Sequence, residues 1–434
     1  MRPKTARSEF MVYVLWMLIL STAALSQKQP PQASISTLPE PSGPYSVGRV
    51  AFDWVDQTRV DEMAENPAAH PELMAYVWYP TEAATKPIRG VLFPGATKID
   101  SVPGVSDSIK GQIFGGNWAL VVSGAITSHA QEDAPLVKNP RTFPVILFSP
   151  GANMTSFQYS SAIEDLVSHG YVVAAIEHPS EVFAVAFPNG DVRTYSAKRI
   201  PKTFRPPPNA TIGQTNAKLQ EWYRHCVEIR AADQSFVLDK LTQLNETSDK
   251  SSKFSGRLDL SHVAAVGHSR GGWASILTCR RDGRVKACVN EDGTSNGEGL
   301  QFPGTSPPKQ PILYVEVPPL LPADWSVLKE LHLTADEWVQ QWHETAYKEF
   351  RTFPAGGYFV ELKLPGLVHY SFTDEVILRA AKDGAKDKED LALRGLHLTE
   401  NVTRAFLDEY LNNEKQTELH DTSEITVKHF EPHH

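Results

Sequence analysis

The sequence contains very few cysteines. Three occur among its 434 residues, at Cys226, Cys279 and Cys288. This small number excludes a fold held together mainly by disulfides, and three cysteines do not provide the ligand spacing of a zinc site. Cys279 and Cys288 can form a disulfide; two buried free thiols are the alternative that the sequence leaves open.

Long basic runs and internal repeats are also absent. The formal net charge is −9 and the pI is about 5.9. An acidic balance without a basic patch argues against nucleic acid as a partner. Residues 27–42 are rich in proline and serine, so we predict a disordered linker there. Because no second set of core elements follows, we predict a single catalytic domain over residues 43–434.

The chain has no second long apolar run after its N-terminus. Basic side chains among the first seven residues precede the apolar residues 10–20, and small residues follow up to Ser26. This order is typical of a secretory signal peptide, and the apolar run is shorter than the roughly 20 residues of a membrane span. We predict a signal peptide over residues 1–26, with a retained signal anchor as the alternative. The mature protein is then secreted, extracellular and without a transmembrane span.

Four Asn-x-Thr sequons agree with this compartment. We predict glycosylation sites at Asn209, Asn245 and Asn401. The fourth sequon, at Asn153, lies one residue beyond a backbone amide to which we assign a catalytic role below. Because a glycan there would obstruct the pocket, we expect Asn153 to be unmodified.

Strand and helix patterns alternate along the chain. Residues 143–149 form a continuous apolar run, which is typical of a parallel strand buried on both faces. A helical pattern over 159–169 and a second apolar run over 171–176 follow, which predicts right-handed crossovers in an α/β sheet. Further predicted elements are strands at 49–54, 73–79, 285–290, 311–316 and 358–364 and helices at 216–244 and 399–411. Irregular stretches predict insertions near residues 84–141, 179–215 and 318–352.

The most informative motif is Gly-His-Ser-Arg-Gly at residues 267–271. An apolar run precedes it and a helix-compatible segment follows, which is the layout of a nucleophile elbow. The two glycines leave room for a strained serine and for close packing of strand and helix. We predict Ser269 as a catalytic nucleophile; an ordinary serine in a Gly-rich turn is the alternative. The motif predicts an α/β fold of one α/β-hydrolase domain, with a mostly parallel central sheet and helices on both faces.

A serine nucleophile requires a histidine base, which is oriented by a carboxylate. In this fold the acid and then the base follow the serine along the chain. Asp292 directly follows a predicted strand and precedes a glycine; Glu291 is its rival, but strand alternation directs it elsewhere. His369 lies in a Gly-containing loop after the last clear strand. We predict Asp292 as the acid and His369 as the base.

Two backbone amides are candidates for the oxyanion hole. The loop at 150–152 lies at the carboxyl end of its strand, where ligands bind in open α/β sheets. We predict that the N–H groups of Ala152 and Arg270 bind the oxyanion.

Taken together, these stretches resemble the secreted platelet-activating factor acetylhydrolases, the lipoprotein-associated phospholipase A2 type, and the broader dienelactone hydrolase and polyesterase relatives. The matching stretches are residues 43–48, 148–152, 168–178, 266–272 and 367–374, with the acid after Val289. The resemblance implies the same triad, Ser269, Asp292 and His369, with Ala152 and Arg270 as oxyanion donors. The chain departs from the family at Arg270, where an apolar residue is usual, at Pro150, where histidine is common, and in the segments 201–208 and 325–350.

The resemblance implies a secreted serine carboxylic-ester hydrolase with phospholipase A2 activity. It would cleave short or oxidised sn-2 acyl esters of phospholipids through an acyl-enzyme, and so act in lipid degradation. A general carboxylesterase or polyesterase of the dienelactone hydrolase type is the alternative, and an inactive binding protein is a further one. Because the nucleophile is a side chain, we expect no cofactor and no metal. The expected partner is a small-molecule or lipid ester, with transient contact to a lipid surface.

Overall fold

The computed structural model describes most of the chain from Leu38 to Pro432. Its gaps fall at residues 65, 67, 83–88, 103–104, 106–109, 180, 196–199, 208, 211, 250–251, 294–305, 319–333, 338–339, 341–343, 345–346, 348–349, 352 and 415–418. The predicted signal peptide and residues 27–37 of the predicted linker lie outside the described residues. The last linker residues are described, and Leu38 among them is buried, so the packed chain begins earlier than we predicted. Among the described helices, none has the length and apolar character needed to cross a membrane.

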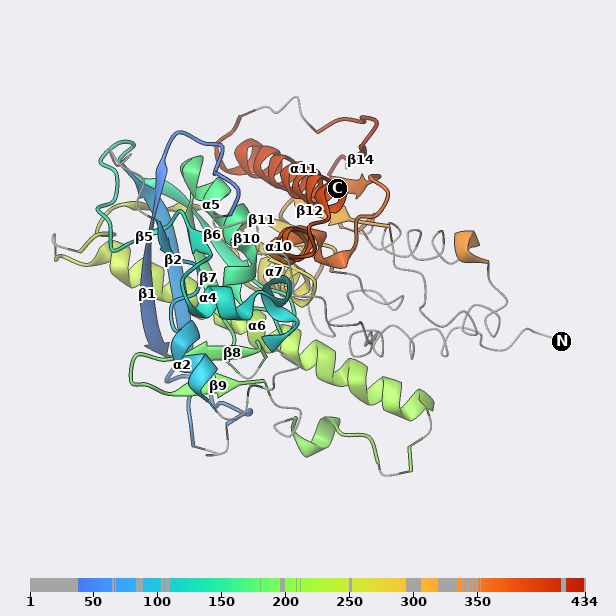
Figure 1. Ribbon diagram of the computed structural model, residues 1–434, viewed down its shortest axis with the longest axis horizontal. Helices are drawn as coiled ribbons and strands as arrows, with labels where there is room; N and C mark the ends of the chain where they lie inside the picture. The colour runs from blue at the N-terminus through green and yellow to red at the C-terminus, as the bar shows by residue number, and fades with distance from the viewer. Residues whose placement is uncertain are drawn as a thin grey trace.

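Within the described residues, the core of the protein is a sheet of ten strands (Figure 1). Their spatial order is β14 (Ile425–Phe430), β13 (Gly357–Leu362), β12 (Ile312–Glu316), β11 (Val285–Glu291), β10 (Leu258–His268), β6 (Phe143–Ser149), β7 (Val172–Glu177), β2 (Glu72–Thr81), β1 (Ser46–Val55) and β5 (Gln131–Glu132). Neighbouring strands from β13 to β7 run parallel, whereas β14, β2 and β1 pair antiparallel. The fold is therefore the predicted mostly parallel α/β sheet.

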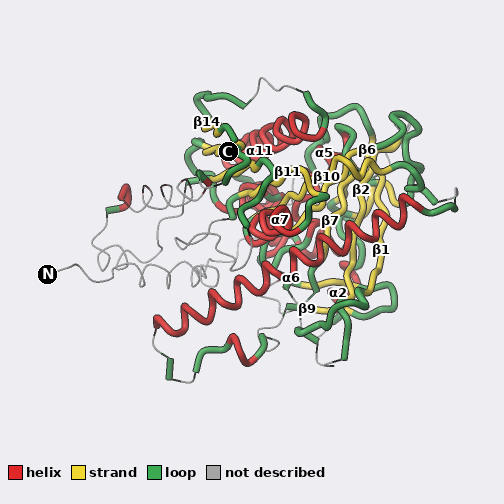
Figure 2. Tube along the Cα trace, turned by 180° about the vertical axis from the view of Figure 1, so that it is seen from behind, coloured by secondary structure: helices red, strands yellow, loops and turns green. Residues whose placement is uncertain are grey.

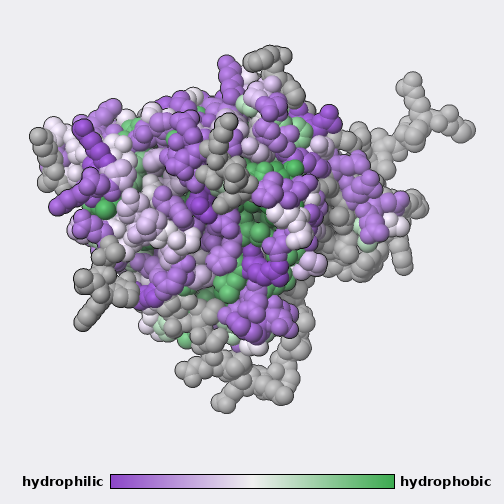
Figure 3. Space-filling view, turned by 90° about the horizontal axis from the view of Figure 1, so that it is seen from above, coloured by the Kyte–Doolittle hydropathy of each residue, from purple (hydrophilic) through white to green (hydrophobic). Residues whose placement is uncertain are grey.

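Helices cover both faces of this sheet (Figures 1 and 2). Alternation within β6 divides the core, because Ile146 and Phe148 face one layer while Val145 and Leu147 face the other. The first layer contains α5 (Ser160–Ser168) and α11 (Lys386–Leu411), and the second contains α6 (Ile212–Glu246) and α7 (Arg270–Arg281). The face of the molecule in Figure 3 is largely hydrophilic, with a hydrophobic strip near its middle.

The insertion after β2 is packed into the core. Its short elements are β3 (Gly90–Val91), α2 (Ala96–Ser101), η1 (Ile113–Gly116), α4 (Trp118–Val122) and β4 (Thr127–Ser128). Phe93 stacks on Phe157 at 4.4 Å between ring centroids, and Phe114 and Trp118 are buried beside it. The described residues of the predicted insertion are therefore part of the packed core and do not form a plain surface excursion.

The remaining elements connect the sheet to its helices. The excursion after β7 holds a hairpin of β8 (Ala184–Ala186) and β9 (Val192–Thr194), followed by η4 (Lys202–Phe204). The crossovers after β6 and β13 begin with η2 (Ser156–Tyr159) and η5 (His369–Phe372), and α10 (Asp374–Asp383) precedes α11. We did not predict α10 or β14, and α11 begins before the predicted residue 399.

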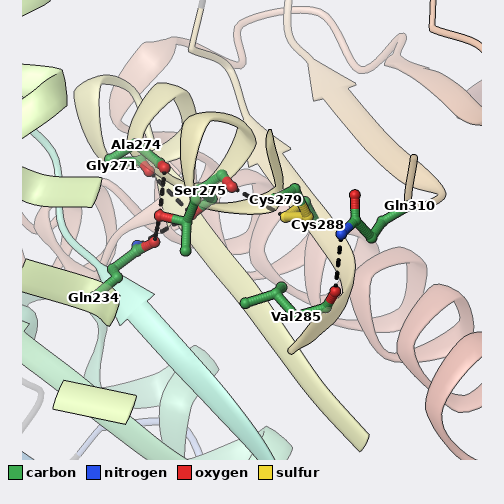
Figure 4. Close-up of a disulfide and its surroundings, with 9 residues drawn as sticks. Gln234, Gly271, Ala274, Ser275, Cys279, Val285, Cys288 and Gln310 are labelled. Atoms are coloured by element: carbon green, nitrogen blue, oxygen red, sulfur yellow. Dashed lines mark hydrogen bonds between the residues drawn. A yellow bond between two sulfur atoms is a disulfide. The ribbon is translucent and has the colours of Figure 1, made fainter. Parts of the chain in front are cut away.

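A disulfide joins Cys279 on α7 to Cys288 on β11, with 6.4 Å between their Cα atoms (Figure 4). It therefore connects the helix that follows Ser269 to the strand that precedes Asp292. Cys226 is a buried free thiol. Of the two alternatives for Cys279 and Cys288, the structure shows the bridge.

Two buried carboxyl groups predict a loss of stability as the pH rises from about 4 to about 8. Burial raises the pKa of Asp374 and that of Glu291 to about 8, and the hydrogen bonds from Ser161 and Thr403 offset this only in part. Each group is then protonated in the folded protein but ionised in the unfolded chain at neutral pH. Their stabilising effect is full below pH about 4 and is lost as the pH rises through about 8.

We expect the free energy of unfolding, measured by urea denaturation, to fall as the pH is raised across this window. The fall should be less steep in Asp374→Asn, which has no group to titrate. Glu246→Gln, at an exposed glutamate, is the matched control and should keep the wild-type slope. Equal slopes in Asp374→Asn and wild type would contradict the prediction.

Candidate active site

The predicted nucleophile and acid lie at the carboxyl ends of two paired strands. Ser269 follows β10 and Asp292 follows β11, and the last residues of these strands, His268 and Glu291, are register partners. The amide of Ser269 donates to the Glu291 carbonyl at 2.8 Å. His369 follows β13, which lies two strands from β11 in the same set of parallel strands. Parallel strands place their carboxyl ends at one edge of the sheet, so the three predicted residues lie along that edge.

Ser269 has the strained backbone of a nucleophile elbow. Its φ of 56° and ψ of −121° are rare for a residue with a side chain. The two motif glycines make this turn sterically possible. A Cβ added to Gly271 would lie 1.9 Å from the Ser149 carbonyl oxygen, and one added to Gly267 would lie 2.4 Å from the Gly271 carbonyl carbon. The turn is therefore pressed against the carboxyl end of β6.

Asp292 and His369 form a close pair, with His369 Nδ1 2.6 Å from Asp292 Oδ2. The Asp292 side chain is 8% exposed and that of His369 is 29% exposed. Burial raises the pKa of Asp292, while the imidazole opposes that shift by binding the carboxylate. The Val317 amide donates to the other carboxylate oxygen at 3.3 Å. Because an ionised carboxylate only accepts hydrogen bonds, Nδ1 carries the proton and Nε2 offers a lone pair.

The loop after β6 leaves one predicted oxyanion donor without a partner among the described residues. Gly151 donates to the Tyr159 hydroxyl at 2.9 Å, and Asn153 donates to the Glu181 carbonyl at 3.0 Å. Between them, the Ala152 amide has no acceptor among the described residues. The Arg270 amide opens α7, where first-turn amides have no intrahelical acceptor. Both predicted donors are thus available for a ligand oxygen.

The Arg270 side chain takes part in a buried ion cluster. Its guanidinium lies 3.6 Å from Glu181 and 4.8 Å from the centre of the Tyr223 ring. Arg230 contacts the same carboxylate at 2.5 Å and is fully buried. Burial alone would raise the pKa of Glu181, but the two guanidinium groups lower it to about 2.

A second Ser–His–Asp chain lies behind the loop after β6, and sequence reasoning missed it. Ser149 Oγ is 2.9 Å from His178 Nε2, and His178 Nδ1 is 2.7 Å from Asp233 Oδ2. All three residues are at most 1% exposed, which excludes substrate from this serine. Arg230 donates to the Pro150 carbonyl at 2.5 Å beside it. The buried chain therefore holds the loop in place, whereas the partly exposed His369 belongs to the accessible site.

The sequence contains one usable signal for this buried chain. His178 lies just after a predicted strand, and Ser149 is the last residue of another. The sequence contains no signal for Asp233 and Arg230. Both lie in the middle of a long helix, and the helical pattern does not show which face of that helix packs against the sheet. Among the described residues, no group of three His, Cys, Asp or Glu side chains could hold a metal ion.

Comparisons with known proteins extend these observations. Residues 32–318 match the family described as platelet-activating factor acetylhydrolase, isoform II. A probable 1-alkyl-2-acetylglycerophosphocholine esterase of Arthroderma benhamiae is 27% identical over 363 residues, which cover 80% of this chain and 81% of the fungal protein. The platelet-activating factor acetylhydrolase of Cavia porcellus is 24% identical over 263 residues. That alignment covers 59% of this chain and 55% of the relative, so the chain spans about half of the mammalian protein's length.

A solved structure has the same fold. The ferulic acid esterase from Streptomyces cinnamoneus superposes with a TM-score of 0.61 at 23% identity. The superposition covers 90% of this chain and 99% of the esterase.

The two serine sites make different predictions for covalent labelling. We expect a fluorophosphonate probe to label the wild type at Ser269 and to label Ser149→Ala at the same residue. Ser269→Ala should remain unlabelled, because the buried Ser149 cannot meet the probe. Peptide mapping by mass spectrometry identifies the modified residue. Label on Ser149, or persistent labelling of Ser269→Ala, would contradict this assignment.

Ser149→Ala also tests the structural role of the buried chain. It removes one partner of His178, and a lost buried hydrogen bond typically costs about 1–3 kcal/mol. We therefore expect a lower free energy of unfolding together with retained labelling.

Proposed function

Because the chain belongs to the platelet-activating factor acetylhydrolase isoform II family and is therefore an ester hydrolase, we propose that Ser269, His369 and Asp292 are its catalytic triad. The observation that carries this proposal is the 2.6 Å contact between His369 and Asp292 at the sheet edge that presents the strained Ser269. With Nδ1 bound to Asp292, the lone pair of Nε2 can take the serine proton. The geometry supports a serine esterase rather than an inactive binding protein.

The reaction proceeds in two half-reactions. Ser269 Oγ attacks the ester carbonyl carbon while its proton passes to His369 Nε2, and Asp292 stabilises the imidazolium. The developing oxyanion receives hydrogen bonds from the Ala152 and Arg270 amides, and such a donor is worth roughly 3–4 kcal/mol. The alcohol leaves with the proton from His369. Water then attacks the acyl-enzyme by the same route, which releases the acid and restores the serine.

We propose a phospholipid with a short or oxidised sn-2 acyl chain as the substrate class. The names of the fungal and guinea-pig relatives support this choice, since both describe esterases that act on an acetylated ether phospholipid or on platelet-activating factor. Arg270 introduces a charged side chain beside the nucleophile, but the guanidinium is paired with Glu181 and largely buried. This pairing is compatible with an apolar acyl group at the serine.

We further propose that the protein is secreted. The N-terminal pattern and the four sequons support this, and so does the Cys279–Cys288 disulfide, because disulfides form and persist in oxidising compartments. Asn209 and Asn401 are exposed, as a glycan requires. Asn153 is exposed too, yet it adjoins the proposed oxyanion donor Ala152.

A hydrolysis panel tests the substrate class. We expect the highest kcat/KM for phospholipids with an sn-2 acetyl or short dicarboxylic acyl chain, and a steep fall for long unoxidised chains. Ser269→Ala is the control for hydrolysis by contaminants. Higher kcat/KM for aryl or polyester substrates than for every phospholipid would instead support a general carboxylesterase.

Two neighbouring acids provide a matched test of the triad. Asp292→Asn keeps the shape but stabilises the wrong histidine tautomer, so kcat should fall about 10⁴-fold. Glu291→Gln should stay within a few-fold of wild type, because that carboxyl group receives a hydrogen bond from Thr403 on α11. Steady-state kinetics on a short-chain ester measures both variants. A larger loss in Glu291→Gln than in Asp292→Asn would reverse the assignment.

A further inference from the structure

His268, the residue before the proposed nucleophile, lies at the centre of a buried chain of hydrogen bonds. Its Nδ1 is 2.8 Å from the Tyr159 hydroxyl, and its Nε2 is 2.9 Å from the backbone carbonyl of His369. The same hydroxyl accepts the Gly151 amide at 2.9 Å. One chain thus runs from the loop that carries Ala152, past Ser269, to the backbone of the proposed base.

The direction of these hydrogen bonds follows from their chemistry. A backbone carbonyl only accepts, so His268 Nε2 must carry the proton. Burial, with a smaller effect of His369, keeps the pKa of His268 well below its usual value, so the ring is neutral and Nδ1 accepts. Tyr159 therefore accepts from Gly151. Its single proton goes to His268 Nδ1, because the other nearby acceptor, Met154 Sδ at 3.1 Å, is the weaker one. A single proton arrangement satisfies all of these contacts.

Packing fixes the rings that form this chain. His268 is fully buried and Tyr159 is 1% exposed. The His268 ring lies 5.3 Å from that of Phe372 and 4.5 Å from that of His369, measured between centroids. Neither the His268 ring nor the Tyr159 ring can move without displacing a loop of the proposed site. Both nitrogens of His268 are occupied, so it cannot serve as the base.

We propose that Tyr159 and His268 are positioning residues that set the oxyanion loop and the base loop relative to the nucleophile. This inference rests on the proposed function, because it assigns Ala152 and His369 the roles argued above. The buried Ser149–His178–Asp233 chain holds the same loop from the other side, whereas only the Tyr159–His268 chain reaches the base. Its loss should therefore reduce turnover more than substrate binding.

Three variants of the Tyr159–His268 hydrogen-bond chain test this proposal. Tyr159→Phe removes the contacts of the hydroxyl with Gly151, His268 and Met154 and retains the ring. His268→Phe retains the aromatic packing on Phe372 without either nitrogen. His268→Gln places an amide N–H near the former Nε2 and can still donate to the His369 carbonyl. Tyr171→Phe is the matched control, because it removes a buried hydroxyl that bonds to Asp408, at the opposite end of β7 from the site.

The readout is kcat per active site on a short-chain ester, with active sites titrated by a fluorophosphonate so that misfolded protein does not count. We expect Tyr159→Phe and His268→Phe to lower kcat about 10- to 100-fold, since small misplacements near reacting groups have effects of this size, while KM changes less than about threefold. His268→Gln should recover part of the loss seen in His268→Phe. The double variant that combines Tyr159→Phe with His268→Phe should show a smaller fold-loss of kcat than the product of the two single losses, because both substitutions act on one hydrogen-bond chain. Tyr171→Phe should lower the Tm and leave kcat per site unchanged.

Unchanged kcat per titrated site in Tyr159→Phe and His268→Phe would overturn the inference, as would multiplicative losses in the double variant. Failure of the proposed function has a different signature, since the wild type would then show neither titration nor hydrolysis. If Tyr159→Phe yields no titratable sites, the comparison of His268→Gln with His268→Phe decides.

Discussion

The site depends on how closely the turn at Ser269 approaches the carboxyl end of β6. The Ser149 carbonyl lies where a side chain on Gly271 would begin, so the two segments fit together only because this position lacks a Cβ atom. The same approach brings the loop at Gly151 and Ala152 beside the start of α7. The proposed nucleophile and both proposed oxyanion donors are therefore positioned by one backbone contact between neighbouring parallel strands.

This contact places the loop after β6 among buried polar side chains. Arg230, Glu181, His178 and Asp233 are each at most 2% exposed, and each is paired. Buried charges are expensive to desolvate, and removing one partner typically destabilises a protein by about 3–5 kcal/mol. Their value here is geometric, because His178 binds the Ser149 hydroxyl and Arg230 binds the Pro150 carbonyl where the loop begins. The strained turn at Ser269 is thus supported by a rigid surround.

Sequence alone predicted the parts of the fold whose pattern is local. The strand at 143–149 has the predicted bounds, because both of its faces are buried and its apolar run is continuous. The elbow was predictable from glycine spacing, and strand ends then located Asp292. The edge strand β14 was not predicted, because only one of its residues is buried and its other side chains are polar or partly exposed. The first half of α11 was not predicted for a similar reason, because the start of that helix is polar.

The support around the candidate site was less predictable. Tyr159, Arg230 and Asp233 belong to helical segments, and their roles depend on which helix face meets the loop after β6. That face is set by tertiary packing of α6 and η2 against the sheet, which no single-chain pattern records. His268 was visible within the motif, but its contact with His369 joins residues 101 positions apart.

The most direct test of the account is a crystal structure of the covalent adduct with a phosphonate analogue of a short-chain ester. The account predicts a bond from Ser269 Oγ to phosphorus. One phosphoryl oxygen should lie about 3 Å from the amide nitrogens of both Ala152 and Arg270, and His369 should remain bound to Asp292. An adduct on another residue, or a phosphoryl oxygen that contacts neither amide, would contradict it.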